Sequence, residues 1–138
     1  MQGAVGYSPG VFDLFHVGHL DALRRAKESC ERLVVGVFAD DLCPVPPVVP
    51  LIERKEIVGH VRHVDEVIEI TELDLRADWE ALGFGLLFTG HDAAPTAEHA
   101  RHALAGTPVR VLAFDGLAET ASPVLRSALS PAARRTVA

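Results

Sequence analysis

Residues 17–39 read VGHLDALRRAKESCERLVVGVFA, and this stretch sets the expected fold class. Its first part, residues 17–30, predicts a helix with Leu20, Leu23 and Ala26 on the apolar face and charged side chains outside. Its second part, residues 32–39, is apolar and β-branched enough for a strand that is buried on both faces. A buried strand directly after a helix is typical of a parallel sheet that is covered by helices.

The same alternation extends in both directions along the chain. Residues 3–8 predict a first strand that runs into a turn at Pro9 and Gly10, and DLCPVPPVVP (41–50) predicts a loop, because four prolines remove backbone donors. Further helices are expected at 51–62, 76–82, 95–105 and 123–135, and further strands at 64–70, 84–90 and 108–114. We therefore predict one α/β domain over residues 1–138, Rossmann-like and doubly wound, with a five-stranded parallel sheet.

The composition narrows the classes of protein and partner. The chain has 138 residues, 49% of them apolar and 23% charged, which suits one globular domain. No apolar run approaches the roughly 20 residues that span a bilayer, and the first ten residues lack the features of a secretory signal. Cys30 and Cys43 form no metal motif, so we expect a cytoplasmic protein. The net charge of −6 argues against a nucleic-acid partner, and any phosphate site must be built locally.

Three pairs of histidines share the spacing His-x-x-His, namely His16/His19, His60/His63 and His99/His102. On a helix this spacing brings both rings to one face, so each pair is a candidate for metal binding. The zinc-peptidase pattern His-Glu-x-x-His is absent from the sequence, and a zinc site needs a third or fourth ligand. A solvated helix face is the simpler explanation for the third pair, and packing or an interface for the second.

The first pair differs because it follows the first expected strand and begins the first expected helix. Gly18, between the rings, removes a side chain where a ligand would approach the backbone. The first helical turn has N–H groups without intrahelical partners and a positive dipole end, both suited to phosphate. These features leave two interpretations open: a phosphate site, or two ordinary histidines at a helix start.

The longer string GVFDLFHVGH, residues 10–19, resembles the [GT]-x-F-D-x-x-H-x-G-H signature of the cytidylyltransferase family, which includes the glycerol-3-phosphate, ethanolamine-phosphate and choline-phosphate enzymes. Other strings that resemble family motifs follow in the right order and spacing. They are RAK at 25–27, LVVGV at 33–37 with Asp40, ER at 53–54, RHVDEVI at 62–68, GHD at 90–92 and ASPVLR at 121–126.

This resemblance implies transfer of a nucleotidyl group: an oxygen of a phosphorylated acceptor attacks the α-phosphate of CTP in line, and pyrophosphate leaves. It implies His16 and His19 as catalytic residues that hydrogen-bond the triphosphate and its transition state. It also implies Mg²⁺ on the phosphate oxygens, and a homodimer. The implied nucleotide-binding residues are Gly10, Val11, Phe12, Asp13, Gly18, Arg54, Arg62, Gly90, Asp92 and Ser122.

Several of these residues also have a structural explanation. Arg54 and Arg62 can form surface ion pairs with the carboxylates at positions 53, 65 and 66. Asp92 can cap the helix that follows it. The apolar side chains at positions 12 and 14 are expected in the core under either interpretation.

Two departures from the family pattern concern positive charge. Family members carry lysines in the loop after the second strand, whereas this chain has no lysine between Lys27 and Lys55. The family's R-T-x-G-like stretch is replaced by AFDGLAET (113–120), which lacks the arginine and adds Asp115 and Glu119. Three interpretations follow: a different acceptor, a second subunit or protein that completes the site, or a nucleotide-binding relative with weak or no turnover.

The sequence thus favours a homodimeric, Mg²⁺-dependent nucleotidyltransferase that uses CTP, or ATP, and a small phosphate- or phosphonate-bearing alcohol. The alternative is a non-catalytic nucleotide-binding or assembly partner. Metal-dependent hydrolysis through the histidine pairs ranks third.

Overall fold

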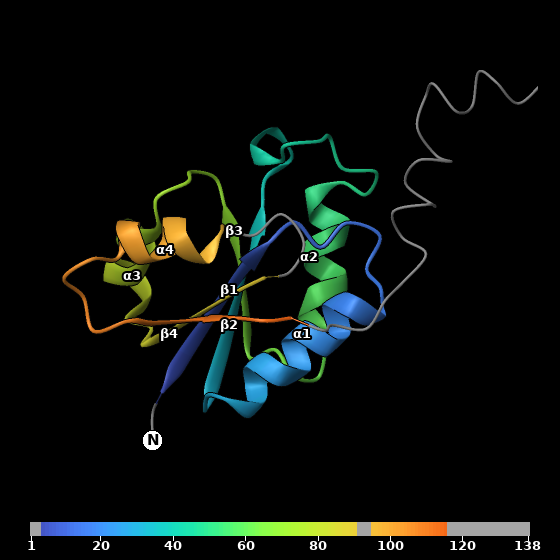
Figure 1. Ribbon diagram of the computed structural model, residues 1–138. Coiled ribbons are helices and arrows are strands. Elements are labelled where there is room, and N and C mark those ends of the chain that lie inside the picture. Colours follow the sequence, from blue (N-terminus) through green and yellow to red (C-terminus); the bar gives the residue numbers. More distant parts are fainter. Residues whose placement is uncertain (1–3, 91–94, 116–138) are drawn as a thin grey trace, which may run out of the picture.

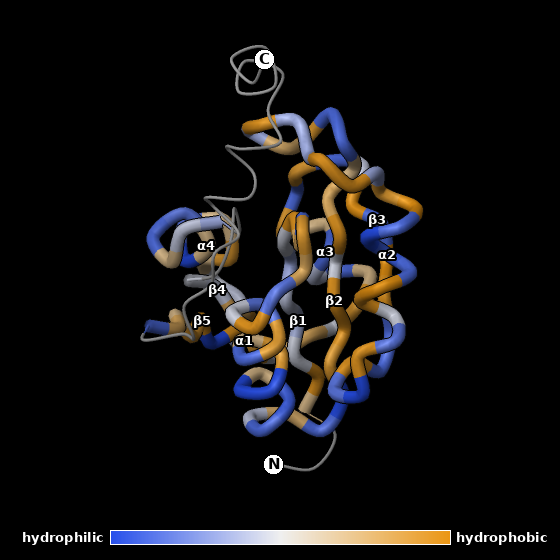
Figure 2. Tube along the Cα trace, turned by 90° about the vertical axis from the view of Figure 1, so that its right-hand side faces the viewer, coloured by the Kyte–Doolittle hydropathy of each residue, from blue (hydrophilic) through white to orange (hydrophobic). Residues whose placement is uncertain are grey.

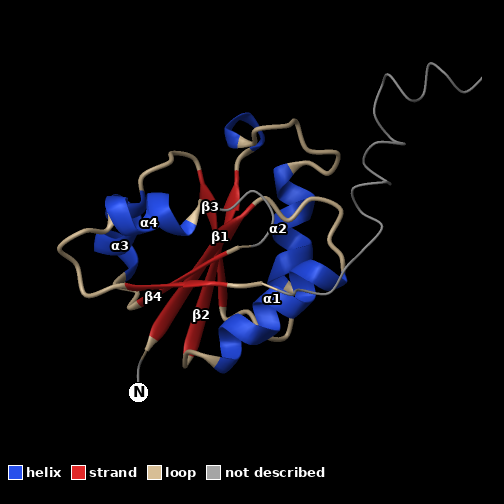
Figure 3. Ribbon diagram, in the orientation of Figure 1, coloured by secondary structure: helices blue, strands red, loops and turns tan. Residues whose placement is uncertain are grey.

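The computed structural model describes residues 4–90 and 95–115. Its five strands pair in parallel, in the spatial order third, second, first, fourth, fifth (Figures 1 and 3). The strands are β1 (Val5–Gly10), β2 (Arg32–Phe38), β3 (Glu66–Ile70), β4 (Leu86–Thr89) and β5 (Arg110–Ala113). The helices are α1 (Val17–Glu28), the short 3₁₀ helix η1 (Asp40–Leu42), α2 (Leu51–Gly59), α3 (Leu75–Leu82) and α4 (Ala97–Ala103). The predicted α/β class with a five-stranded parallel sheet is confirmed.

Two helical layers cover the sheet. Helices α1 and α2 lie on one face and α3 and α4 on the other (Figure 1). Strand β2 supplies both cores, because Val35 and Val37 pack on the α1/α2 side and Val34 and Phe38 on the α3/α4 side. In Figure 2, β2 is accordingly coloured orange, for hydrophobic residues, along most of its length. A strand buried on both faces explains its unbroken apolar sequence.

The strand order reverses beside β1. The chain moves outward from β1 through β2 to β3 and then returns to the other side of β1 with β4 and β5. In doubly wound sheets the crevice at such a reversal, beyond the carboxyl ends of the strands, is where ligands bind. The segment between β1 and α1, residues 11–16, starts at this point.

Two local predictions near this point are wrong. The expected turn at Pro9 and Gly10 is part of β1, since both residues pair with β2. The central strand tolerates proline because the pairing of β1 with β4 ends at Tyr7. Leu20 was expected in the core but is 43% exposed, whereas its neighbour His19 is 2% exposed. Leu23 and Ala26 are buried as predicted, so the expected apolar face of α1 is wrong only at its first position.

The remaining boundaries shift by at most two residues, except that α2 ends at Gly59 rather than at 62. Helix α4 starts after Thr96, whose hydroxyl accepts the His99 N–H. The Pro-rich segment is a loop as predicted, apart from η1 at its start. The helix expected at 123–135 lies outside the described residues.

Candidate functional site

The connection between β1 and α1 has an unusual backbone. Phe12 and Leu14 both adopt left-handed conformations, with φ of 57° and 48°. Each such non-glycine residue is strained by about 1–3 kcal/mol, which surrounding contacts must offset. Here the offset includes burial of the Phe12 ring, which is 1% exposed in the core beneath α1. The left-handed conformations of Phe12 and Leu14 turn the chain from the end of β1 into the first turn of α1.

His16 and His19 then cap the helix for each other. His16 is the N-cap residue, and its Nδ1 accepts the Gly18 N–H at 3.0 Å. Three residues later, Nδ1 of His19 accepts the His16 N–H at 3.3 Å. This is the reciprocal arrangement of a capping box, in which Ser or Thr and Glu usually take these two positions. Both predicted catalytic residues are thus held at the helix start by the backbone itself.

This pattern of hydrogen bonds also determines where each ring carries its proton. A neutral imidazole that accepts a hydrogen bond at Nδ1 carries its hydrogen on Nε2. Both histidines are therefore set up as Nε2–H donors. A donor of this kind at the positive end of a helix is suited to an anionic oxygen, such as that of a phosphate.

Aromatic contacts fix the ring planes. The His16 and His19 rings stack with centroids 3.8 Å apart and an interplanar angle of 25°. Phe12 meets His19 edge-on at a centroid distance of 5.4 Å, and Phe15 lies 5.3 Å from the same ring. His19 is consequently buried and His16 is half-buried. These contacts explain how His19, rather than Leu20, occupies the inner face of α1.

Asp13 ties this connection to the Pro-rich loop. Its carboxylate is fully buried and accepts the Val48 and Val49 N–H groups, each at 2.8 Å. Both of these hydrogen bonds go to backbone groups of the protein. The loop segment without lysine therefore lies directly against the histidine segment.

Arg54 holds the same loop from the other side. Its Nε donates to the Val49 carbonyl and one terminal nitrogen donates to the Val11 carbonyl, both at 2.7 Å. The second terminal nitrogen pairs with the Asp40 carboxylate. Arg54 is 1% exposed, so the alternative of a surface ion pair with Glu53 is wrong. A buried arginine with three protein acceptors therefore joins the connection after β1, the Pro-rich loop and α2.

The other predicted nucleotide-binding residues fall into three places. Gly10, Val11 and Gly18 are buried in or beside the histidine segment. Gly90 follows β4 directly and has a φ of 89°, and a Cβ there would collide with the Phe114 carbonyl oxygen. Arg62 is exposed in the connection before β3, at the amino-terminal edge of the sheet, so this chain does not bring it to the histidines. Asp92 and Ser122 lie outside the described residues.

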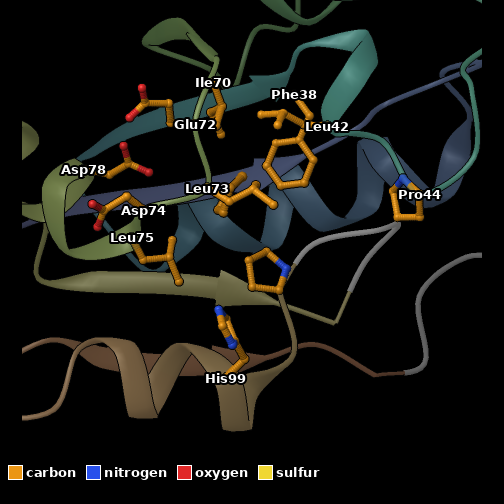
Figure 4. Close-up of a pocket in the computed structure, with 12 residues that line it drawn as sticks. Phe38, Leu42, Pro44, Ile70, Glu72, Leu73, Asp74, Leu75, Asp78 and His99 are labelled. Atoms are coloured by element: carbon orange, nitrogen blue, oxygen red, sulfur yellow. The ribbon is translucent and has the colours of Figure 1, made fainter.

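A cavity of about 170 Å³ opens on the α3/α4 side of the carboxyl edge of the sheet. Sequence reasoning missed it, because its walls come from strand ends, a loop and two helices that are far apart along the chain. His99 is exposed, as a solvated helix face predicts, but it also lines this cavity (Figure 4). Nearby, at the end of β4, the fully buried Thr89 hydroxyl has no hydrogen-bond partner among the described residues.

Within residues 4–90 and 95–115, no three His, Cys, Asp or Glu side chains gather closely enough to hold a metal ion. Likewise, none of the helices in those ranges combines the length and apolarity that crossing a bilayer requires.

Comparisons with known proteins point to one family. A family model described as cytidylyltransferase-like matches residues 7–129. The chain is 48% identical over 65 residues to an ethanolamine-phosphate cytidylyltransferase of Arabidopsis thaliana, which covers 45% of this chain and 15% of that protein. It is 40% identical over 63 residues to an FAD synthase of Pyrococcus abyssi, with 43% of each covered. These matches span less than half of either relative.

A solved structure shares the fold. The lipopolysaccharide core biosynthesis protein of Thermoplasma volcanium superposes with a TM-score of 0.71 at 20% identity, covering 84% of this chain and 98% of that one. This similarity concerns the arrangement of strands and helices alone.

Proposed function

Because this chain belongs to the cytidylyltransferase-like family, we propose that it transfers CMP from CTP to a small phosphate- or phosphonate-bearing alcohol and releases pyrophosphate. One observation carries the proposal: His16 and His19 accept backbone N–H groups at Nδ1, which leaves both rings as Nε2–H donors at a helix N-terminus. Phosphoryl transfer requires such donors where charge builds on phosphate oxygens.

The proposed reaction needs no covalent enzyme intermediate. A lone pair on an acceptor phosphate oxygen forms the new bond to the α-phosphorus of CTP. The bond from that phosphorus to the oxygen that bridges to the β-phosphate breaks, and its electron pair leaves with pyrophosphate. His16 and His19 donate hydrogen bonds to the triphosphate as negative charge shifts onto its oxygens. The nucleotide enters as its Mg²⁺ complex, in which the ion neutralises phosphate charge.

The backbone around the histidines supports this role. The Asp13 and Arg54 contacts hold the loop and the histidine segment in one arrangement before any ligand binds. Preorganised donors stabilise a transition state without reorganising at the moment of reaction. We assign Asp13 and Arg54 as positioning residues, because their hydrogen bonds go to protein groups.

A homodimer in the cytoplasm completes the proposal. Arg62 is relevant to the dimer because it lies at the amino-terminal edge of the sheet, opposite to the histidines of its own chain. An Arg62 that contributes to a nucleotide site would therefore serve the site of a second copy. Analytical ultracentrifugation tests the assembly, and a monomer at all concentrations would contradict it.

The second candidate is a nucleotide-binding protein without turnover. The observation in its favour is that Cys43 to Pro50 carries no lysine, while the acids Asp40 and Asp41 precede it. A phosphate clamp that lacks cations stabilises the transferring phosphate less. Nucleotide binding by calorimetry with no turnover would support this candidate.

Pyrophosphate release distinguishes the two functions. The folded protein is incubated with Mg²⁺, with CTP or ATP, and with a panel of small phosphate and phosphonate monoesters. Transferase activity predicts release that depends on both the nucleotide and one class of acceptor. Folded protein that releases no pyrophosphate with any pair would overturn the proposed reaction.

A further inference from the structure

The end of β5 lies against α1, the helix that begins with the two histidines. β5 ends at Ala113, and the next residue, Phe114, packs against the core on the α1/α2 side of the sheet. Its ring stacks on Phe88 with centroids 5.5 Å apart and an interplanar angle of 8°. The carbonyl of Asp115 then accepts a hydrogen bond from Nη1 of Arg25, in α1, at 2.9 Å. In Figure 1 the orange end of β5 accordingly reaches the blue helix α1.

Strand β4 fixes Phe114 from the other side. The Phe114 N–H donates to the Thr89 carbonyl at 2.9 Å. Gly90 also lies against this residue, since a Cβ on Gly90 would come within 2.4 Å of the Phe114 carbonyl oxygen. These contacts place Phe114, whereas Asp115 is exposed and is joined to α1 by the Arg25 hydrogen bond. Arg25 therefore affects the direction of the chain after β5 rather than the position of β5 itself.

Asp21 orients the guanidinium of Arg25. Asp21 stands one turn earlier in α1, and its carboxylate accepts Nε and Nη2 of Arg25 at 3.4 and 3.1 Å. This pairing along one side of the planar guanidinium directs Nη1 away from Asp21 and toward Asp115. The adjacent Arg24 pairs with Asp21 at 2.5 Å and with Glu28 at 2.6 Å, both in α1. Because Asp21 already matches the charge of Arg25, Asp115 meets an oriented donor rather than an uncompensated cation.

The sequence beyond Asp115 includes Ser122, which the resemblance to the cytidylyltransferase family implies as a nucleotide-binding residue. Ser122 follows Asp115 by seven residues, and an extended chain of that length spans at most about 25 Å. Along α1, Arg25 follows His19 by six residues, or about 9 Å at 1.5 Å per residue. A chain that is held at Arg25 thus starts close enough for Ser122 to reach the histidines. The stretch held there, 113–120, is also the one that lacks the family arginine.

We propose that Arg25 is a positioning residue for the proposed reaction: it directs the chain beyond Asp115 toward the histidine end of α1 and so presents Ser122 to the nucleotide phosphates. This inference rests on the proposed function and adds a residue that touches neither nucleotide nor acceptor. Arg25 acts through one exposed hydrogen bond, whose net contribution limits the effect to about twofold to tenfold in nucleotide affinity. The apparent affinity changes because it scales with the fraction of molecules in the binding-competent arrangement.

Three variants separate the donor from its charge. Arg25→Met removes the donor, so calorimetric titration with CTP and Mg²⁺ should give a Kd raised by about twofold to tenfold. Arg24→Met is the matched control and should leave Kd unchanged, because Arg24 pairs with the same Asp21 but with Glu28 in place of Asp115. Arg25→Lys keeps the charge but lacks the planar fork that bonds Asp21 and Asp115 together, so it should resemble Arg25→Met. Native affinity in Arg25→Lys, or equal losses in Arg24→Met and Arg25→Met, would overturn the inference.

A double-mutant cycle tests whether Arg25 acts through Ser122. Ser122→Ala should weaken CTP binding in the native background and weaken it less when Arg25→Met is already present, because the chain is then no longer directed toward the site. Losses that multiply, or a Ser122→Ala variant that binds CTP like the native chain, would overturn the coupling. Urea unfolding accompanies each titration, and Arg25→Met and Arg24→Met should differ little in stability, since both remove exposed ion pairs. A loss of CTP affinity that follows the loss of stability would make Arg25 merely structural and contradict the proposal.

Calorimetry separates this inference from the proposed reaction, since it needs no turnover. If no acceptor supports pyrophosphate release but Arg25→Met binds CTP about twofold to tenfold more weakly than Arg24→Met, the positioning role holds and the reaction fails. If pyrophosphate is released and the two variants bind CTP equally, the reaction holds and the positioning role is refuted. Native protein that binds neither CTP nor ATP would refute both.

Discussion

His16 has two roles in this account, and they reside on different ring nitrogens. Nδ1 caps α1 by accepting the Gly18 N–H at 3.0 Å, whereas Nε2–H is assigned to phosphate. Asparagine separates them, because its Oδ1 is attached to Cγ as Nδ1 is in histidine, and asparagine is a strong N-cap residue. It has no atom at the position of Nε2. His16→Asn should therefore retain the helix cap and lose the phosphate donor, while His16→Ala loses both.

The expected magnitudes follow from the contacts. Removing the cap costs about 1 kcal/mol. Losing the ring stack with His19, whose centroid lies 3.8 Å away, costs about 0.5–1.5 kcal/mol more. His16→Ala should thus lower the free energy of unfolding by about 1.5–2.5 kcal/mol, and His16→Asn by about 0.5–1.5 kcal/mol. Both should lower kcat by about 10²–10³-fold, the usual effect of removing one transition-state donor.

Urea unfolding measures the stabilities, and pyrophosphate release measures kcat. His16→Ala and His16→Asn should differ in stability but match in activity. His16→Asn with activity within a few-fold of the native chain would refute the Nε2 donor. Equal stabilities of the two variants would refute the Nδ1 cap.

Three further predictions concern the supports of the site. Arg54→Met should lower the free energy of unfolding by about 2–6 kcal/mol, because it leaves the Val11 and Val49 carbonyls without their donor at about 1–3 kcal/mol each; a loss below about 1 kcal/mol in urea unfolding would contradict a structural role for these bonds. Gly90→Ala should destabilise more than Gly83→Ala, since both glycines have positive φ but only the first would place a Cβ 2.7 Å from Phe114 N, and equal losses would exclude the steric cause. Desolvation opposes ionisation of Asp65, but Lys27 and the Leu33 N–H prevail and lower its pKa; the stability that it contributes is therefore present above its unfolded pKa of 3.8 and lost as the pH falls through the lower folded value. Asp65→Asn should accordingly be less stable than the native chain at pH 7, by up to about 1 kcal/mol for this partly exposed group, and urea unfolding at a series of pH values should show the difference shrink as the pH falls below 3.8.

Local patterns predicted the sheet well, and predicted the inner face of α1 well except at its first turn. Every residue from Leu33 to Phe38 is apolar or glycine, so β2 could be placed as a strand with two buried faces. On α1 the same reasoning placed Leu20 inside, because a helical pattern counts histidine as polar. His19 is buried instead, since its Nδ1 finds a backbone donor and its ring finds aromatic neighbours.

Contacts between distant segments explain what sequence reasoning could not supply. Arg54 is buried because its acceptors include the Val11 carbonyl, 43 residues away, and no local pattern encodes that partner. The mutual caps of His16 and His19 use an arrangement known from Ser, Thr and Glu, so the spacing was visible but its purpose was not. The cavity on the α3/α4 side is lined by three strand ends, a loop and two helices that are far apart in the sequence, so no local pattern predicts it.

The central claim is transfer of a nucleotidyl group, and the fate of each CTP phosphate tests it most directly. The protein is incubated with Mg²⁺, with each member of a panel of small phosphate and phosphonate monoesters, and with CTP that is radiolabelled at either the α- or the γ-phosphate. The account predicts that α-label moves to the acceptor and γ-label to pyrophosphate, in equal amounts. Transfer of γ-label to the acceptor, its release as inorganic phosphate, or α-label that stays in CTP with every acceptor tested would contradict it.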